Sequence, residues 1–148
     1  MQASFSIGEL ARKTGVKVPT IRYYESAGLL PKPCRTASNR RTYGAEDAER
    51  VGFIRHAREL GFAMEDIRAL LELAVEPQQS CHLADSIARR TLKSIEARMA
   101  LLNALHGELS RMVSECGQGM VADCKVMSVI ADHARCNDGN HGDARDLV

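Results

Sequence analysis

The sequence is poor in aromatic residues and has no long apolar run. It contains no tryptophan, three tyrosines and three phenylalanines, although 45% of its 148 residues are hydrophobic. This composition favours helices that pack through Leu, Ile, Ala and Met. No run approaches the ~20 apolar residues of a membrane span, and the first residues have neither the charged nor the apolar region of a secretory signal. We therefore expect a cytoplasmic protein with one compact domain plus an extension, and no membrane partner.

The sequence also lacks the even number of cysteines that a set of disulfide bonds needs. Its five cysteines stand at positions 34, 81, 116, 124 and 136. Because thiols stay reduced in the cytosol, this pattern favours metal binding or redox chemistry over disulfide bonds. No nucleophile–base pair and no phosphate-binding loop is visible in the sequence, so we do not expect an enzyme.

A net charge of +1 conceals an uneven distribution of charge along the chain. Residues 1–44 carry eight Lys and Arg against two Asp and Glu, a net charge of +6, so residues 45–148 carry twelve against seventeen, a net charge of −5. A basic first segment indicates an anionic partner, whereas the acidic remainder argues against a general polycation.

The basic segment and the residues that follow it carry the signals of four short helices. Ser6 and Glu9 have the spacing of a capping box at the start of the first helix, and Gly15 can end that helix in the left-handed conformation. Pro19 suits the first turn of the second helix. Two short helices joined by a glycine-containing turn predict a helix-turn-helix. The expected helices are Ile7–Thr14, Pro19–Ala27, Glu46–Leu60 and Met64–Leu73.

The segment between the second and third helices is rich in turn-forming and basic residues. Pro31 and Pro33 prevent it from being helical, so we expect a short hairpin, or wing, that lies against a phosphate backbone. We expect the second helix to enter the major groove of DNA, where Arg22 can contact either a guanine or a phosphate. The predicted DNA-binding residues are Lys17, Thr20, Arg22 and Tyr23 of the helix and Arg40, Arg41 and Tyr43 of the wing.

After Pro77 the sequence carries an apolar seam that predicts one helix from about Ser80 to Cys116. Its positions alternate by four and three, and only His106 is polar, which is typical of a coiled coil. The seam consists of Ala88, Leu92, Ile95, Met99, Leu102, His106, Leu109, Val113 and Cys116. A helix ~50 Å long cannot be covered by so small a domain, so a partner helix, parallel or antiparallel, must bury the seam. We expect a homodimer.

The predicted fold class is therefore mainly α, with three segments. Residues 1–75 form the winged helix-turn-helix DNA-binding domain, and residues 76–116 form the dimerisation helix. Residues 117–148 hold a loop broken by two glycines, a short helix over Lys125–Ala131, and a polar tail from Cys136 that we expect to be poorly ordered.

Four features in this order resemble the MerR family of bacterial regulators over about residues 5–130: SIGELARKTGVKVPTIRYYESAGLLP, the basic NRRTY, FIRHARELGFAMEDI, and then a long helix. The resemblance implies a dimer with a winged helix-turn-helix, an antiparallel coiled coil and an effector site near the ends of that coil. The resemblance also implies binding to double-stranded promoter DNA in which the −35 and −10 elements are too far apart for RNA polymerase to start transcription. The effector makes the dimer bend and untwist that DNA, so that RNA polymerase can start.

Three cysteines, Cys81, Cys116 and Cys124, frame the predicted dimerisation helix and resemble the metal-sensing branch of the family. The resemblance implies that the first cysteine comes from one protomer and the two loop cysteines from the other. A cysteine at position 81 is similar to the divalent-metal sensors, and thiolates select soft ions such as Zn, Cd, Pb and Hg. Seven residues separate Cys116 from Cys124, a spacing similar to that of the copper, silver and gold sensors, which leaves a monovalent effector as the alternative.

Further ligands and other functions stay open at this point. His82, His133 and Cys136 are candidates for a fourth metal ligand, since zinc prefers four. A redox sensor with an iron–sulfur cluster needs four cysteines close together, and Cys136 stands too far from the pair to favour it. A drug-binding regulator is also disfavoured, because only 32 residues follow Cys116.

Overall fold

The computed structural model describes residues 4–136 and residue 142, so most of the polar tail predicted after Cys136 lies outside the described residues. The chain divides into two compact units, Met1–Ala88 and Arg89–Val148. This division falls within the long helix, whereas the boundaries predicted at residues 75 and 116 remain predictions. The elements are α1 (Ile7–Thr14), α2 (Val18–Ser26), β1 (Cys34–Arg35), β2 (Arg41–Thr42), α3 (Ala45–Glu59), α4 (Met64–Ala74), α5 (His82–Glu115), the 3-10 helix η1 (Val121–Asp123), α6 (Lys125–Ala131) and the 3-10 helix η2 (His133–Arg135).

The start of α1 confirms the predicted capping box. The Ser6 hydroxyl accepts a hydrogen bond from the backbone N–H of Glu9, and the Glu9 carboxylate accepts one from the backbone N–H of Ser6 at 2.7 Å. Gly15 ends the helix with φ at +68°, a conformation that suits glycine because it has no Cβ. Helix α2 begins at Val18, one residue before the prediction, and its second residue is Pro19. Local sequence signals therefore end α1 at Gly15 and begin α2 at Val18 and Pro19, which defines the turn of the helix-turn-helix.

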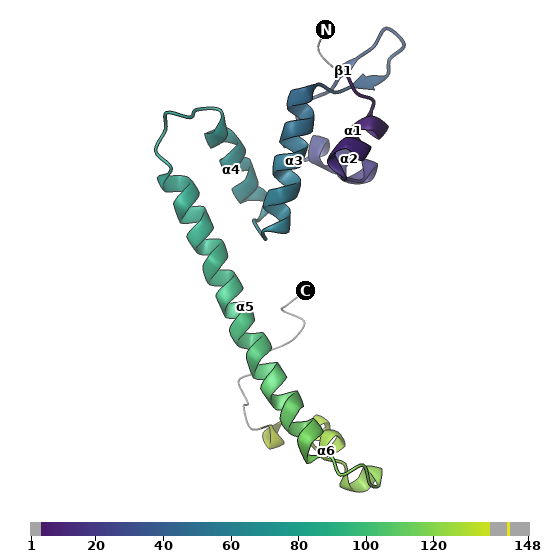
Figure 1. Cartoon of the computed structure of the whole chain (residues 1–148), viewed down its shortest axis with the longest axis vertical. Coiled ribbons are helices and arrows are strands. Elements are labelled where there is room, and N and C mark those ends of the chain that lie inside the picture. Colours follow the sequence, from purple (N-terminus) through teal and green to yellow (C-terminus); the bar gives the residue numbers. More distant parts are fainter. Residues whose placement is uncertain (1–3, 137–141, 143–148) are drawn as a thin grey trace. The chain divides into compact units, whose positions relative to one another are not determined.

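The core of the first unit lies between the first four helices. Leu10, Ile21, Val51, Ile54 and Ile67 are fully buried there, and each comes from one of these helices. Figure 1 shows α1, α2 and α3 packed together, in agreement with the contacts of α1 with both α2 and α3. Each helix therefore buries its apolar stripe against the others, which fixes the exposed face of α2.

Arginine side chains from α3 and α4 join these helices to the ends of α1 and α2. Arg55 donates to the carbonyl of Thr14 at 2.8 Å, and Arg68 donates to the carbonyl of Ala27. The last carbonyls of a helix have no partner within it, so each guanidinium satisfies a group at a helix C-terminus, where a cation is also favourable. These contacts tie α3 to the end of α1 and α4 to the end of α2.

The predicted wing is confirmed as a two-stranded antiparallel hairpin. Strand β1 pairs with β2 in a register that sets Cys34 opposite Thr42 and Arg35 opposite Arg41. Asn39 turns the chain with φ at +62°, in the left-handed region that asparagine tolerates. Phe5 forms a further antiparallel bridge with the residue after β2. The wing is thus attached to the chain segment that leads into α1.

Helix α5 is one continuous helix of 34 residues, as the seam predicted (Figure 1). The large apolar residues of that seam are exposed in the single chain, from 40% for Ile95 to 71% for Val113. No helix among the described residues combines the length and hydropathy that a membrane span requires. An apolar stripe of this kind on a helix needs a partner surface, since soluble monomers rarely expose a contiguous one.

At the end of α5 the chain turns back through a loop into α6, whose bounds match the prediction. Val129 of α6 and Met112 of α5 are both buried in the second unit. Gln118 in the loop has φ at +52°, and η1 follows before α6 begins. The short helix is therefore held by apolar contact as well as by its own hydrogen bonds.

The exposed seam generates a prediction about assembly. Leu102→Glu places a charge at the middle of the seam in both protomers, and burying each leucine is worth about 1.5–3 kcal/mol. We expect the variant to raise the dimer dissociation constant by at least about a hundredfold, measured by sedimentation velocity over a concentration series. Ser94→Glu, on the outer face of α5, is the matched control. A Leu102→Glu protein that stays dimeric at the same concentrations as Ser94→Glu would contradict the seam assignment.

Candidate metal centre and nucleic-acid interface

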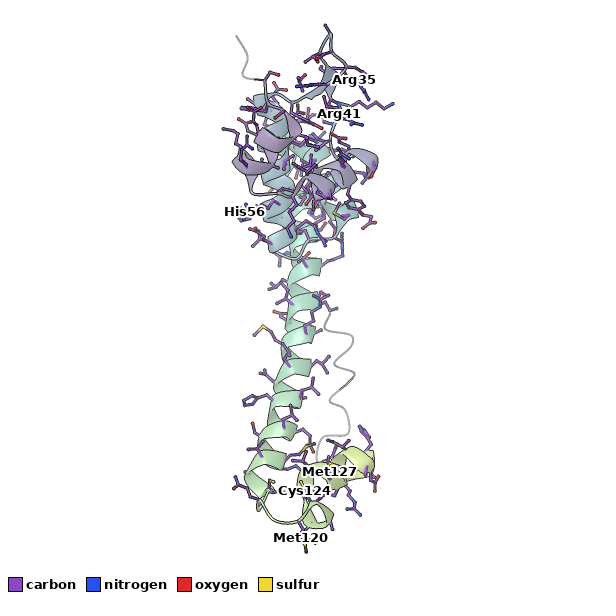
Figure 2. All side chains as sticks on the ribbon, turned by 90° about the vertical axis from the view of Figure 1, so that its right-hand side faces the viewer. Arg35, Arg41, His56, Met120, Cys124 and Met127 are labelled. Atoms are coloured by element: carbon purple, nitrogen blue, oxygen red, sulfur yellow. The ribbon has the colours of Figure 1, made fainter. Side chains whose placement is uncertain are left out.

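Cys116 and Cys124 lie at the two ends of the loop between α5 and α6. Cys116 follows the last residue of α5, and Cys124 is the N-cap residue of α6. Both side chains are partly exposed, and the Cys116 thiol is near enough to Cys124 to lower the pKa of Cys124. Figure 2 shows Cys124 in the loop region beyond α5, with Met120 and Met127 near it along the chain. The structure thus brings together two of the three predicted metal ligands.

The surroundings of Cys124 favour its thiolate form. The backbone N–H of Met127 donates to the sulfur and lowers the pKa of Cys124, and the N–H of Val126 and the thiol of Cys116 act in the same direction, while desolvation opposes them. A hydrogen bond to the charged form stabilises that form. The thiolate is the form of cysteine that binds metal ions, and the local backbone favours that form at Cys124.

The third predicted ligand, Cys81, stands at the start of α5. Its side chain is exposed, and its carbonyl accepts from the backbone N–H of Asp85 in the first turn. Ser80 caps this end weakly, through its hydroxyl and the N–H of His82 at 3.3 Å. Among the described residues, no group of three or more His, Cys, Asp or Glu side chains is arranged to hold a metal ion.

The candidates for a fourth ligand do not join the pair. Desolvation and the nearby buried carboxylate of Glu108 raise the pKa of Cys136. His82 is the exposed first residue of α5, and His133 is the first residue of η2. The roles of all three residues as ligands remain predictions.

Two charged residues beside the pair were not predicted. Glu115 immediately precedes Cys116, Lys125 immediately follows Cys124, and the Lys125 ammonium lies 3.4 Å from the Glu115 carboxylate. The signal in the sequence is the opposite charges that flank the two cysteines. The sequence alone does not show that these two charges are in contact, because they are ten residues apart and the loop brings them together.

The predicted DNA-binding residues of α2 lie on an accessible face. Lys17 is the N-cap residue of α2, Arg22 and Tyr23 are exposed, and Thr20 is half-buried. Tyr24, the next residue, packs into the core. A positively charged helix face with an exposed tyrosine can contact both base edges and phosphates.

The wing presents a second group of cations. Arg40 and Arg41 are exposed, and Arg35 donates to the Asn39 side chain at 2.8 Å across the turn. Figure 2 shows Arg35 and Arg41 near each other at the hairpin. A cluster of arginines on a hairpin is suited to phosphate oxygens, which guanidinium groups bind with two hydrogen bonds.

Tyr43 departs from the prediction that it contacts phosphates. It is only 2% exposed, and its hydroxyl donates a hydrogen bond to the Glu25 carboxylate. Burial and this bond raise the pKa of Tyr43. The Glu25 carboxylate also lies 3.9 Å from Arg41. Because Glu25 belongs to α2, Tyr43 serves to attach the wing to that helix, and we remove it from the set of DNA-contacting residues.

The chain matches two sequence families. One, described as the MerR HTH family regulatory protein, covers residues 5–74, and the other, described as MerR, DNA binding, covers residues 48–112. Two relatives match over 113 residues, which are 76% of this chain. The HTH-type transcriptional regulator ZntR of Escherichia coli K12 is 39% identical, with 80% of its length covered. The mercuric resistance operon regulatory protein of Pseudomonas fluorescens is 38% identical, with 77% of its length covered.

A solved structure gives the same result for the fold. The transcription regulator PbrR691 from Ralstonia metallidurans CH34, in complex with lead(II), superposes with a TM-score of 0.74 and 32% identity, over 85% of this chain and 98% of that one. The helix-turn-helix, the wing and the long helix are the features that the sequence and the structure have already established. The chain belongs to the MerR family of helix-turn-helix regulatory proteins.

Proposed function

We propose that this protein is a metal-responsive transcriptional regulator that binds promoter DNA as a homodimer and activates transcription when a soft divalent metal ion binds its cysteine thiolates. The observation that carries the proposal is the placement of Cys116 and Cys124 at the two ends of one loop, where backbone N–H groups and the Cys116 thiol lower the pKa of Cys124. A pair of soft ligands on a regulator of this family supports a site for a soft metal effector.

The chemistry of the ligands supports a soft ion of charge +2. Thiolates prefer Zn, Cd, Pb, Hg and Cu(I) to Mg and Ca, and three thiolates suit a divalent ion better than a monovalent one. One similar protein is known in complex with lead(II), and another is named for mercuric resistance. The ligand set accepts any of the four divalent ions. The seven-residue spacing of the pair keeps copper(I), silver and gold as the alternative effectors.

Cys81 of the partner subunit is the third ligand in this proposal. Helix α5 has 34 residues and a length of ~50 Å, so a chain cannot fold its own Cys81 onto its own Cys116 while that helix is intact. In an antiparallel pair, each helix start meets the end of its partner. The exposed seam supports such a pair, because it runs between the two cysteines on one helix face.

DNA recognition is assigned to α2 and the wing. Lys17, Thr20, Arg22 and Tyr23 of α2 would read the major groove, and Arg40 and Arg41 would hold the backbone. Metal binding across the dimer junction would move one DNA-binding half relative to the other. The change in DNA shape, more than a change in affinity, would then allow RNA polymerase to start.

Cys124→Ser tests the proposal directly. We expect it to abolish induction by every soft metal and to leave promoter affinity unchanged, because the pair and the DNA-binding residues lie on separate elements. Induction is measured in a reporter strain and affinity by fluorescence anisotropy with the metal-free dimer. Cys34→Ser, at another exposed cysteine, is the matched control and should respond as the wild type does. Full induction of the Cys124→Ser protein by zinc, cadmium, lead or mercury would contradict the proposal.

Two arginine variants separate base reading from backbone contact. Arg22→Ala should lose about 1–3 kcal/mol on the specific promoter and relax its sequence preference if Arg22 reads a base. Arg40→Ala should weaken specific and random DNA equally and reduce the dependence of affinity on salt. Both are measured by anisotropy titrations over a series of salt concentrations. Equal losses of both variants on both DNAs would overturn the assignment of α2 as the base-reading helix.

A further inference from the structure

We propose that Glu115 and Lys125, anchored by Arg111, form a salt-bridge clasp that holds Cys116 and Cys124 together before a metal ion arrives and thereby sets the metal affinity of the pair. The clasp rests on the proposed function, since it concerns the same two cysteines. The three charged residues are positioning residues: they act through the cysteines and do not bind the metal.

The ion pair joins the two ends of the loop beside the two cysteines. Glu115 and Cys116 are neighbours at the end of α5, and Cys124 and Lys125 are neighbours at the start of α6. The Lys125 ammonium and the Glu115 carboxylate are 3.4 Å apart. A side chain added at either loop glycine, Gly117 or Gly119, would meet nothing within 4 Å. The loop between the thiols is therefore open, and its ends are joined by this ion pair.

The Glu115 carboxylate is fixed from the side of α5. The same oxygen that faces Lys125 lies 3.1 Å from Arg111, one turn earlier on the helix. Arg111 in turn binds the carboxylate of Glu108, which is only 5% exposed, and donates to the carbonyl of Arg135 at 3.3 Å. An anchored partner loses less side-chain freedom when the ion pair forms than a freely rotating one does.

Holding two ligands near each other reduces the entropy that metal binding must remove. Metal ligands are commonly oriented by neighbours that do not touch the metal, and loss of those neighbours weakens binding. The Lys125–Glu115 pair is partly exposed, at 38% and 43%, so its influence should be modest. We expect each single neutral variant, Glu115→Gln or Lys125→Gln, to weaken metal binding about two- to fivefold.

A double-mutant cycle distinguishes the clasp from a simple effect of nearby charge. If the two charges acted independently on the site, the effects of the single variants would add in the double variant. In a clasp, either single substitution already breaks the ion pair, so the second substitution has no further effect. The variant Glu115→Gln/Lys125→Gln should therefore bind metal as weakly as either single variant and no more weakly. The charge-swapped variant Glu115→Lys/Lys125→Glu and the conservative Lys125→Arg should recover most of the wild-type affinity.

The experiment is a competitive titration of cadmium(II) against a chromophoric chelator, with the reduced full-length dimer under anaerobic conditions. Glu59→Gln is the matched control, because it removes an exposed ion pair with Arg55 in the other unit and should leave the cadmium affinity unchanged. Circular dichroism and sedimentation confirm that each variant remains folded and dimeric. If Glu115→Gln does not fold, the exposed Lys125 variants, including Lys125→Arg, carry the test.

The outcomes separate the clasp from the proposed function. A wild-type dimer that binds no cadmium through its cysteines overturns the proposed function and the clasp with it. A wild type that binds cadmium, with single variants whose effects are absent or add in the double variant, overturns the clasp and leaves the proposed function standing. Weaker binding in both single variants, no further loss in the double variant and recovery in the charge swap support the clasp.

Discussion

The apolar seam of α5 is the constraint on which the rest of the molecule depends. Its leucine, isoleucine, methionine and valine side chains are exposed in the single chain, and burying them is the main favourable free energy available to hold two protomers together. In the dimer that we propose, the seam determines how the two helices align and therefore which cysteines lie close together. In the arrangement that we propose, the start of each helix, with Cys81, is covered by the end of its partner, with Cys116.

The two functional regions are prepared in different ways. In the DNA-binding region, α1 and α2 are fixed by a capping box at the start of α1, by the buried core, and by the Arg55 and Arg68 contacts to the ends of the two helices. In the thiol region, the glycines of the loop between α5 and α6 have open space around them, and the ends of the loop are joined by the ion pair of Lys125 with Glu115. A well-packed DNA-binding region combined with a less constrained thiol region suits a regulator that acts by changing the shape of DNA.

Local signals in the sequence were sufficient to predict the helices and the wing. The Ser6–Glu9 spacing, the glycine at position 15 and the prolines of the wing each act over a few residues, and the bounds of α6 were predicted without error. The side-chain partners were not predictable in this way. Tyr43 looked like a phosphate contact in a basic segment, but it packs inward against Glu25. The contact of Cys136 with Glu108 joins residues 28 positions apart, and no pattern of neighbours in the sequence indicates it.

Mixed dimers test the central claim, that each metal site is shared between two protomers, most directly. A Cys81→Ser protomer is paired with a Cys116→Ser/Cys124→Ser protomer by using two affinity tags, and cadmium(II) bound to the purified heterodimer is measured. The account predicts one complete three-thiolate site and one empty site, and so one tightly bound ion per heterodimer. A heterodimer that holds no more cadmium than the background of the two mutant homodimers would contradict it.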